Sequence, residues 1–303
     1  MDVGVIGVGV MGQNHARVYS EMRGVGDLVI FDLDTEAAKR VAKKNDALVA
    51  ESMDELLSQV EAVNCCVPTP FHYKVAEEII GRGVHLLIEK PICLNSADGA
   101  RLAEMVPDGL TVGVGHIERF NPIVSEITKI VKDPLYVEFK RHNPASGRVS
   151  GSSVVEDLMI HDIDIVTNGL FSDGYSLTSI GNQEVCSALF DFSGTPVYLS
   201  ASRKSSRKIR SVHIEEEDFT VVGDFMSQEL YIYRKPGQYR VEDERYVQEN
   251  IIEKVMVGKL EPLKTELATF LKCAGTGKEF PITPEQAVNN LKICEEITRG
   301  CSG

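Results

Sequence analysis

The sequence predicts an α/β fold in which an N-terminal, doubly wound parallel sheet precedes an α+β domain with a largely antiparallel open sheet. Three observations lead to this class. Strand-like and helix-like segments alternate up to about residue 118, and a glycine-rich turn joins the first strand to the first helix. Beyond residue 118, strand-like runs follow one another without helices between them. The predicted domains are therefore 1–118 and 119–303.

The first domain is predicted from short apolar runs that alternate with helical segments. Val and Ile dominate these runs, as in parallel strands that are buried on both faces. We expect strands at 2–6, 28–31, 47–49, 62–67, 84–88 and 110–114. Ser52 to Glu55 form a capping-box sequence at the start of one intervening helix. A sheet of this kind binds its ligand at the carboxyl ends of its strands.

The second domain is predicted to combine a few helices with many strands. We expect helices at 121–132 and 153–170, on either side of a strand at 135–141. Further strands are expected at 175–180, 184–192, 196–202, 209–215, 218–223 and 228–234. Two helices follow, near 261–275 and 284–299, and the second begins with a capping box that has proline at its first position.

Composition limits the class of protein and of partner. Hydrophobic residues make up 43% and charged residues 25%, as in ordinary globular proteins. A net charge of −13 argues against nucleic acid or a membrane surface as a partner. No apolar stretch is long enough to span a membrane, and the chain enters its first strand with no leader ahead of it. Seven cysteines without metal-ligand spacing predict reduced thiols, no metal site and a cytoplasmic location.

The motif Gly7-Val8-Gly9-Val10-Met11-Gly12 lies between the first strand and the first helix. Gly7 permits the tight turn, Gly9 lets a pyrophosphate approach the backbone, and Gly12 lets helix and strand pack closely. The helix N-terminus offers N–H groups and a partial positive charge to the phosphates. Strand, turn and helix together predict a dinucleotide-binding (Rossmann) sheet with these residues at its cofactor site.

Asp32 ends the second predicted strand, twenty residues beyond Gly12. A carboxylate at this position would accept hydrogen bonds from both hydroxyls of the adenosine ribose and would repel a 2′-phosphate. The next residue is Leu33, and no Arg or Lys beside it could hold that phosphate. We therefore predict NAD rather than NADP as the cofactor.

Two loops at the carboxyl ends of predicted strands carry further candidates. Residues 66–72 follow the fourth strand, and the candidates for cofactor binding there are Cys66, Pro68, Thr69 and His72. The alternative is a plain strand-to-helix loop. Glu89-Lys90-Pro91 follows the fifth strand, where Glu89 and Lys90 could contact the cofactor and Pro91 permits a cis bond. A partly desolvated Lys90 could also act as a general base, although Glu and Lys after a strand are often only solvated.

Asp157 and His161 lie four residues apart on an otherwise apolar predicted helix. Together with Asp164 they form a polar stripe on one face of that helix. Burying the stripe without partners would be costly, so it should face a cleft or be paired internally. A carboxylate beside a histidine raises the imidazole pKa and orients the ring. The stripe is therefore either a catalytic pair or a structural Asp–His pair that holds the helix.

A basic stretch runs from Arg203 to Arg210 in this acidic chain. It could be a solvated edge strand that is guarded against aggregation. Alternatively, Arg207 and Arg210 could bind the phosphates of an anionic substrate. Arg119 and Asn121, where the two predicted domains join, are further candidates for substrate binding.

These motifs, in this order, resemble the family of glucose–fructose oxidoreductase and inositol dehydrogenase (Gfo/Idh/MocA) over essentially the whole chain. The resemblance is carried by the glycine motif, by Glu89-Lys90-Pro91 and by the segment 157–164. It implies an NAD-dependent dehydrogenase that acts on CH–OH groups. It also implies that Lys90, Asp157 and His161 surround one bound sugar beside the nicotinamide, and that the protein is a homodimer or homotetramer.

Four segments resemble more narrowly a mainly microbial subgroup that includes UDP-N-acetylglucosamine 3-dehydrogenases: 115–122, 156–162, 224–230 and 261–264. This likeness implies oxidation at C3 of a UDP-amino sugar, with the basic stretch at its pyrophosphate. Either His161 or Lys90 would take the hydroxyl proton, the other would stabilise the alkoxide, and Asp157 would orient the pair. The alternatives are a dehydrogenase of a free sugar or cyclitol, a reductase of a non-sugar acceptor, and a non-catalytic dinucleotide-binding regulator.

Overall fold

The computed structural model describes residues 1–144, 152–172, 174–236, 239–242, 245–248 and 250–301. The chain divides into two compact units. Unit 1 comprises Met1–Ile117 and Glu261–Lys292, and unit 2 comprises Glu118–Leu260 and Ile293–Gly303. The chain leaves unit 1 close to the predicted boundary at residue 118. The structure differs from the predicted division in that a later segment, Glu261–Lys292, returns to unit 1.

Unit 1 is built on a six-stranded parallel sheet with the order β3-β2-β1-β4-β5-β6. Its strands are β1 (Val3–Ile6), β2 (Leu28–Phe31), β3 (Leu48–Val49), β4 (Ala62–Cys65), β5 (His85–Glu89) and β6 (Val112–Gly115). The strand order reverses between β1 and β4, and this switch point is where a doubly wound sheet binds its ligand. The predicted Rossmann sheet is confirmed.

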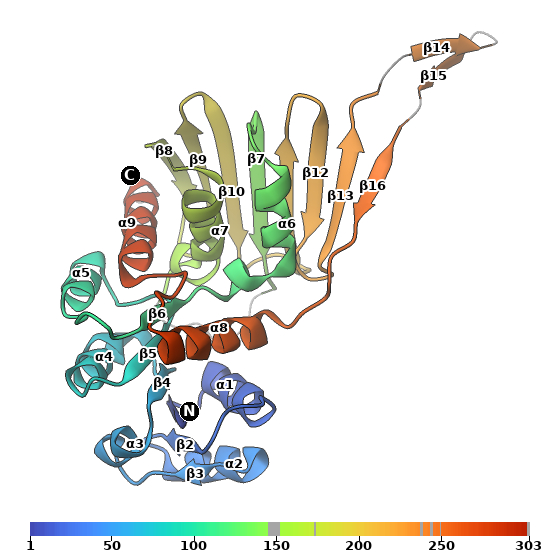
Figure 1. The fold of residues 1–303 in the computed structure, drawn as a ribbon. Coiled ribbons are helices and arrows are strands. Elements are labelled where there is room, and N and C mark those ends of the chain that lie inside the picture. Colours follow the sequence, from blue (N-terminus) through green and yellow to red (C-terminus); the bar gives the residue numbers. More distant parts are fainter. Residues whose placement is uncertain (145–151, 173, 237–238, 243–244, 249, 302–303) are drawn as a thin grey trace. The chain divides into compact units, whose positions relative to one another are not determined.

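Helices cover both faces of this sheet (Figure 1). One face carries α1 (Val10–Ser20), α2 (Thr35–Asn45) and α8 (Pro262–Thr276), and the other carries α3 (Met53–Gln59), α4 (His72–Gly81) and α5 (Ser96–Glu104). The predicted capping box begins α3, because the Ser52 hydroxyl oxygen accepts the backbone N–H of Glu55 at 3.1 Å.

The late segment joins unit 1 because it completes the core beside β6. The rings of Phe270 and Phe280 meet edge to face, with 6.1 Å between their centroids. The Phe280 ring fills the space that a side chain on Gly113 would need. The backbone N–H of Val114 donates to the carbonyl oxygen of Ile282 at 3.1 Å, so the edge of β6 is also covered. These contacts join residues that are far apart in the sequence, so local patterning does not reveal them.

Unit 2 contains an eight-stranded sheet with the order β16-β13-β12-β11-β7-β10-β9-β8. Its strands are β7 (Tyr136–His142), β8 (Ser176–Gly181), β9 (Val185–Phe192), β10 (Thr195–Ser202), β11 (Ile209–Glu215), β12 (Phe219–Asp224), β13 (Glu229–Arg234) and β16 (Ile252–Val255). Neighbouring strands are antiparallel except β7 and β10, which run parallel. The largely antiparallel open sheet is thus confirmed. The sequence did not predict β16 or the separate pair β14 (Tyr239–Glu242) and β15 (Arg245–Gln248).

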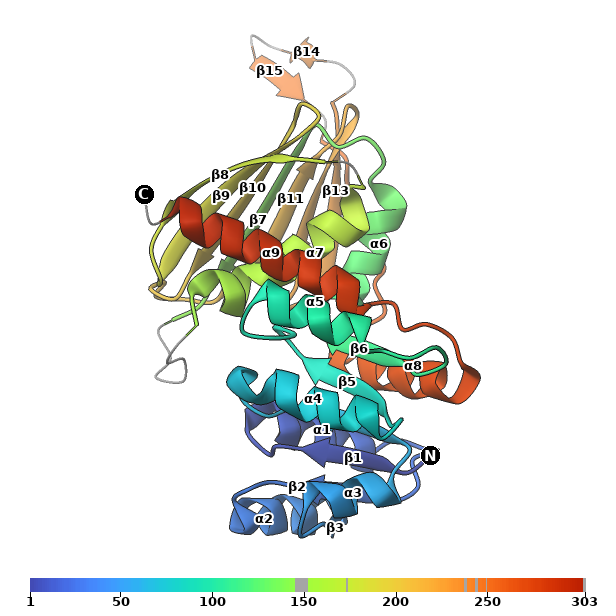
Figure 2. The same ribbon diagram turned by 90° about the vertical axis from the view of Figure 1, so that its left-hand side faces the viewer.

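Helical segments cover one face of this sheet (Figure 2). They are α6 (Pro122–Ile130), the last turns of α9 (Pro284–Gly300), and a continuous stretch formed by a π-helix at Val155–Met159, α7 (Ile160–Ile165) and a π-helix at Val166–Leu170. No described helix covers the opposite face, where Leu189 is 49% exposed. Within the described part of the chain, no helix is both long enough and apolar enough to cross a membrane.

Candidate active site

The turn between β1 and α1 has the geometry of a dinucleotide cradle. Gly7 has a positive φ of 87°, and a Cβ on Gly12 would lie 1.8 Å from the carbonyl oxygen of Gly7. Neither position therefore accepts another residue without strain or a clash. A Cβ on Gly9, in contrast, would meet nothing within 4 Å. The turn and packing glycines serve the fold, whereas Gly9 leaves the backbone open to a ligand.

The start of α1 is open to an anion. Gly9 is its N-cap, no side chain caps its first turn, and that turn contains no acidic residue. Val10, which is exposed, and Met11 belong to this first turn. Backbone N–H groups at a helix N-terminus bind phosphate well. The cradle therefore fits the pyrophosphate of a dinucleotide.

Asp32 lies directly after β2 and is tied to the same turn. Its Oδ2 accepts the backbone N–H of Val8 at 2.7 Å, and its Oδ1 accepts that of Asp34 at 2.8 Å. The carboxylate is thus held beside the glycine turn, at the place where the sequence predicts an acceptor for the adenosine ribose. Together with the cradle, it fits a bound NAD.

His72 joins the loop after β4 to the loop after β5. The ring is buried, with Nδ1 lying 2.8 Å from the carbonyl oxygen of Pro91 and Nε2 lying 2.8 Å from that of Val67. Burial lowers the pKa of His72, and the two carbonyl contacts only partly offset this effect. His72 therefore fixes the shape of both loops. Pro68 is exposed in the first loop, and Thr69 begins a short 3-10 turn, Thr69–Phe71.

Glu89 ends β5, and the peptide bond between Lys90 and Pro91 is cis, which the proline permits. Lys90 is half-buried. A chain of buried hydrogen bonds leads to Glu89 from α1 and β4. The Tyr19 hydroxyl donates to Asn64 Oδ1 at 2.5 Å, Asn64 Nδ2 lies 2.7 Å from His15 Nδ1, and His15 Nε2 lies 2.8 Å from Glu89 Oε1.

The sequence analysis did not predict this series of hydrogen bonds from Tyr19 to Glu89. The available signal was the placement of polar residues inside apolar elements, such as Asn64 in the middle of β4. Burial alone would raise the pKa of Glu89, but His15, and after it Lys90 and His72, hold that pKa below its usual value. The carboxylate is therefore favoured in its ionised form.

Cys66 adds a thiol to this cluster, since ligand atoms of His15, Cys66 and Glu89 all lie within 4.8 Å of one another. Nitrogen, sulfur and oxygen at this spacing are a possible donor set for zinc. Burial, however, raises the pKa of the Cys66 thiol well above its usual value, which disfavours the thiolate that a metal needs. His15 and Glu89 also bond directly to each other. The chemistry of these groups therefore favours a hydrogen-bonded network.

In unit 2, acidic residues of the helical stretch 155–170 meet arginines from other elements. The three pairs are Asp157 Oδ2 with Arg203 Nε at 3.3 Å, Asp162 Oδ1 with Arg141 Nη2 at 2.6 Å, and Asp164 Oδ2 with Arg119 Nε at 2.8 Å. A second contact makes the Arg119–Asp164 pair bidentate. Part of the predicted polar stripe is thus paired internally, while Asp157 and His161 are half-buried.

The predicted basic stretch separates into buried and exposed parts. Arg203 is buried, and its guanidinium donates to the carbonyl oxygens of Ser152 and Ser153, each at 2.9 Å, as well as to Asp157. It therefore positions both the start of the helical stretch and the Asp157 carboxylate. Arg207 and Lys208 remain exposed.

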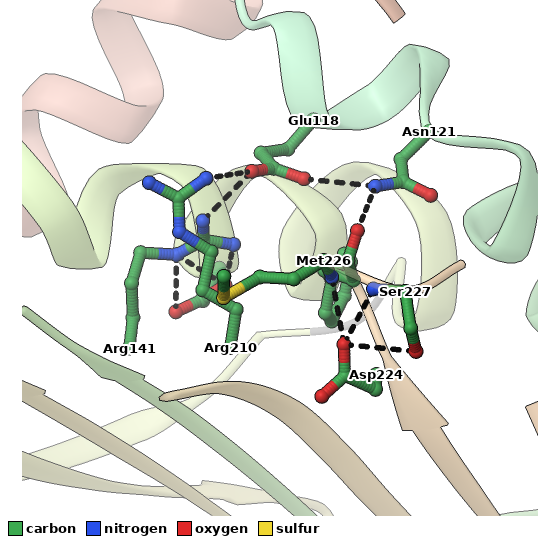
Figure 3. Close-up of polar contacts among 9 residues, drawn as sticks. Glu118, Asn121, Arg141, Arg210, Asp224, Met226 and Ser227 are labelled. Atoms are coloured by element: carbon green, nitrogen blue, oxygen red, sulfur yellow. Dashed lines mark hydrogen bonds and ion pairs between the residues drawn. The ribbon is translucent and has the colours of Figure 1, made fainter. Parts of the chain in front are cut away.

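Arg210 belongs to a charge cluster centred on Glu118 (Figure 3). Glu118 Oε1 accepts from Arg141 Nη1 at 2.9 Å and from Arg210 Nη1 at 3.1 Å. Burial opposes the charge on Glu118, but the two arginines hold its pKa below the usual value. The Arg210 side chain keeps 32% of its surface exposed.

Asn121 lies at the other end of this cluster (Figure 3). Its Nδ2 donates to Glu118 Oε2 at 3.3 Å and to the carbonyl oxygen of Phe225 at 3.1 Å, and its Oδ1 accepts the N–H of Ile123 at the start of α6. Asp224 holds the turn between β12 and β13, because its Oδ1 accepts the N–H groups of Met226 and Ser227, each at 2.8 Å. The structure therefore turns Asn121 inward, whereas Arg210 reaches the surface.

Comparison with known proteins gives these observations a family. A family model described as "Oxidoreductase family, NAD-binding Rossmann fold" (GFO_IDH_MocA) matches residues 1–116. A UDP-N-acetylglucosamine 3-dehydrogenase from Acidithiobacillus ferrooxidans is 31% identical over 285 residues, which cover 89% of this chain and 88% of that protein. An inositol 2-dehydrogenase from Corynebacterium glutamicum is 28% identical over 178 residues, which cover 54% of this chain and 52% of that protein.

A solved structure extends the likeness. It is that of a UDP-N-acetylglucosamine 3-dehydrogenase from Acidithiobacillus ferrooxidans, with a TM-score of 0.88 and 27% identity, and it covers 99% of this chain and 97% of that one. The glycine cradle and the anchored Asp32 agree with the NAD-binding description of the family model. The chain belongs to the Gfo/Idh/MocA family of NAD-binding oxidoreductases.

Proposed function

We propose that this oxidoreductase transfers hydride between NAD and C3 of a UDP-amino sugar such as UDP-N-acetylglucosamine. The observation that carries the proposal is that two arginines close together in the sequence reach the surface: Arg207 is exposed, and the Arg210 side chain is 32% exposed beside Glu118. Two cations at the surface of a chain with net charge −13 suit a diphosphate. The relative that is 31% identical carries the same activity in its name.

The cofactor has its place in unit 1. NAD, when bound, accepts the hydride at its nicotinamide ring. The cradle of Gly7, Gly9 and Gly12 would hold its pyrophosphate, and Asp32 its adenosine ribose. NAD is preferred over NADP because the anchored carboxylate would repel a 2′-phosphate.

The proton of the sugar hydroxyl needs an acceptor, and Lys90 and His161 are the two candidates. Either Lys90 or His161 takes this proton, and the other stabilises the developing alkoxide, so that the secondary alcohol becomes a ketone as its C–H hydride leaves. Asp157, which Arg203 holds, orients and polarises this pair. General acid–base catalysis of this kind contributes roughly 10²–10⁴ in rate.

A free sugar or cyclitol is the second candidate substrate, because the inositol dehydrogenase relative matches about half of the chain. Such a substrate carries no diphosphate and would not need Arg207 or Arg210. The two candidates therefore differ in their response to the loss of these cations.

A panel of alcohols tests the substrate by the appearance of NADH absorbance. We expect oxidation of UDP-N-acetylglucosamine but not of N-acetylglucosamine or myo-inositol. In the variant Arg207→Ala/Arg210→Ala, the KM for the UDP-sugar should rise at least about tenfold, which corresponds to roughly 1.4 kcal/mol. Preferential oxidation of the free sugar or the cyclitol, with a KM that this variant leaves unchanged, would establish the second candidate.

The catalytic roles are tested with Lys90→Met and His161→Ala. Each should lower kcat by at least about 10², while the affinity for NADH is kept. Near wild-type turnover in both variants would contradict the assignment.

Two further properties belong to this proposal. The uncovered face of the eight-stranded sheet supports a homodimer or homotetramer. The odd number of cysteines, seven, without metal-ligand spacing supports a reducing compartment, the cytoplasm, as the location.

A further inference from the structure

We propose that His15 is a positioning residue for Lys90 and that it acts through Glu89. The proposal rests on the proposed function, because that function gives the Lys90 amine its part in proton transfer. It is carried by the contact between His15 Nε2 and Glu89 Oε1 at 2.8 Å, in which the two side chains are only 1% and 11% exposed. A contact so well shielded from water is strong, since screening and competition by solvent are small.

The direction of each hydrogen bond in the chain follows from its far end. The Asn64 amide oxygen has no hydrogen to give, so the Tyr19 hydroxyl donates to it. The Asn64 Nδ2 then faces His15 Nδ1 and donates to it. The ring proton must therefore sit on Nε2, which donates to Glu89. Tyr19 and Asn64 thus select the His15 tautomer that supports an ionised Glu89.

The surroundings of Glu89 show what His15 contributes. Groups that act on the Glu89 charge, or on which it acts, are His15 of α1, Lys90, His72 at the start of α4, and the thiols Cys65 and Cys66. Glu266 of α8 acts on the neighbouring Tyr19 and Cys66. Burial opposes a charge on Glu89, and His15 is the largest of the influences that favour it. Without His15, we expect Glu89 to take up a proton.

The consequence falls on Lys90, the next residue in the chain. The charges of Glu89 and Lys90 act on each other, and an ionised carboxylate on the neighbouring residue stabilises an ammonium group. If Glu89 becomes neutral, the Lys90 ammonium group loses this neighbouring negative charge. His15 would thus set the charge state and orientation of a catalytic group without touching the substrate.

The first test uses the chemistry of Lys90 itself and needs no turnover. The full-length protein is labelled by reductive methylation from about pH 6 to 10, a range that spans amine titration, and the extent at Lys90 is read by mass spectrometry. The midpoint should move down by about one pH unit in His15→Ala and in Glu89→Gln. His15→Gln should lie nearer wild type, because its amide can still donate to Glu89. The exposed Lys43 of α2 serves as the reference amine.

A purely structural role for His15 gives a different result. His15→Ala would then lower the melting temperature but leave the Lys90 midpoint at its wild-type value, and this result overturns the proposal. If His15→Ala does not fold, Glu89→Gln decides instead. A wild-type midpoint in that variant likewise overturns the proposal.

A second test follows turnover with whichever alcohol the panel identifies. The limb of the pH profile of kcat/KM that reports Lys90 should move to lower pH in His15→Ala and Glu89→Gln, while the affinity of His15→Ala for NADH stays within about twofold of wild type, which is less than roughly 0.5 kcal/mol. A profile that coincides with wild type in both variants counts against the proposal. If no alcohol is oxidised, the proposed function fails, whereas the labelling midpoints still decide the role of His15.

Discussion

Asp32 shows, at the scale of one residue, how a side chain can close a turn and select a ligand. Both of its oxygens accept backbone N–H groups, from Val8 at 2.7 Å and from Asp34 at 2.8 Å. These contacts fix the carboxylate beside the glycine cradle. A ribose hydroxyl pair can share such an acceptor, whereas a 2′-phosphate would meet a negative charge that cannot move away.

The first prediction concerns the selectivity of Asp32. Wild type should bind NADH more tightly than NADPH, and Asp32→Ser should narrow that ratio at least about tenfold, or roughly 1.4 kcal/mol, because repulsion of the 2′-phosphate is lost. Fluorescence titration with the two reduced cofactors measures both affinities. The exposed Glu36, in the first turn of α2, gives the control variant Glu36→Gln, which should keep the wild-type ratio. Tighter binding of NADPH by wild type would contradict the prediction.

The acids of the helical stretch 155–170 also show what a residue type alone leaves open. Asp157, Asp162 and Asp164 differ little in sequence context, yet each meets a different arginine. Asp162 and Asp164 are buried, and their pairs hold unit 2 together. Asp157 is half-buried, one helical turn before His161, and Arg203 holds its carboxylate. Burial, rather than residue type, separates the structural acids from the candidate catalytic acid.

At the scale of elements, the glycines between β1 and α1 have different functions. Gly12 is needed because the helix passes so close to the turn that a Cβ would lie 1.8 Å from the Gly7 carbonyl oxygen. At Gly9, in contrast, a Cβ would meet nothing within 4 Å, and the backbone has an ordinary negative φ of −63°. The fold therefore tolerates a methyl group at Gly9 but not at Gly12.

The second prediction uses this difference as a matched pair. Gly12→Ala should destabilise the protein by at least about 3 kcal/mol, because helix and strand must separate. The free energy of unfolding of Gly9→Ala should stay within about 1 kcal/mol of the wild-type value. Gly9→Ala should nevertheless bind NADH at least about tenfold more weakly, because the methyl group occupies the space through which the pyrophosphate approaches the backbone. Urea denaturation and NADH fluorescence measure the two effects. Equal stability of both variants would argue against the described packing.

The loops after β4 and β5 are coupled by a titratable group, His72. Burial lowers its pKa from the ordinary 6.5. As the pH falls, the unfolded chain therefore binds this proton before the folded protein does. The contribution to stability is complete above about pH 6.5 and is lost as the pH falls through the lower pKa of the folded state.

The third prediction is a pH dependence with that sign. The free energy of unfolding should fall between about pH 6.5 and 5, and His72→Asn should reduce the slope. Part of the slope should remain, because burial also lowers the pKa of His85 and of His142. Urea denaturation at several pH values in this range measures the free energy of unfolding. A slope that is unchanged in His72→Asn would show that this histidine is not buried in its neutral form.

At the scale of the whole molecule, the eight-stranded sheet presents one face that no described helix covers (Figure 2). Its exposed side chains include Ile180 at 78%, Leu189 at 49% and Tyr233 at 41%. The strand register places all three on the same face. An open sheet face with exposed apolar side chains is a typical site of association between identical chains.

The fourth prediction is that this face joins copies of the chain. Wild type should elute as a dimer or tetramer, and Ile180→Lys/Leu189→Lys should shift it toward the monomer, because charges in a buried interface lose their hydration. Size-exclusion chromatography with light scattering measures the mass. Leu48→Lys, at an exposed position in β3 of unit 1, is the control and should keep the wild-type mass. A monomeric wild type would refute the prediction.

Local patterns in the sequence were enough for the fold class and for the glycine turn between β1 and α1. The glycine motif, the strand at 28–31 and the capping box at Ser52 depend on residues that are neighbours in the chain, and the structure confirms all three. Consecutive strand-like runs without helices between them likewise predicted most strands of unit 2. The roles of Lys90, Asp157 and His161 came from resemblance, and they stay predictions.

Only the tertiary structure decided the long-range pairings. Residues 261–292 pack in unit 1. His15 contacts Glu89, which is 74 residues away in the sequence, and Arg203 contacts Asp157, which is 46 residues away. The physical reason is that periodicity and capping act within a few residues, whereas the partner of a buried charge is chosen by which elements pack together. The sequence by itself thus determined a dinucleotide-binding turn and two kinds of sheet, and the folded chain decided which polar side chains support the chemistry there.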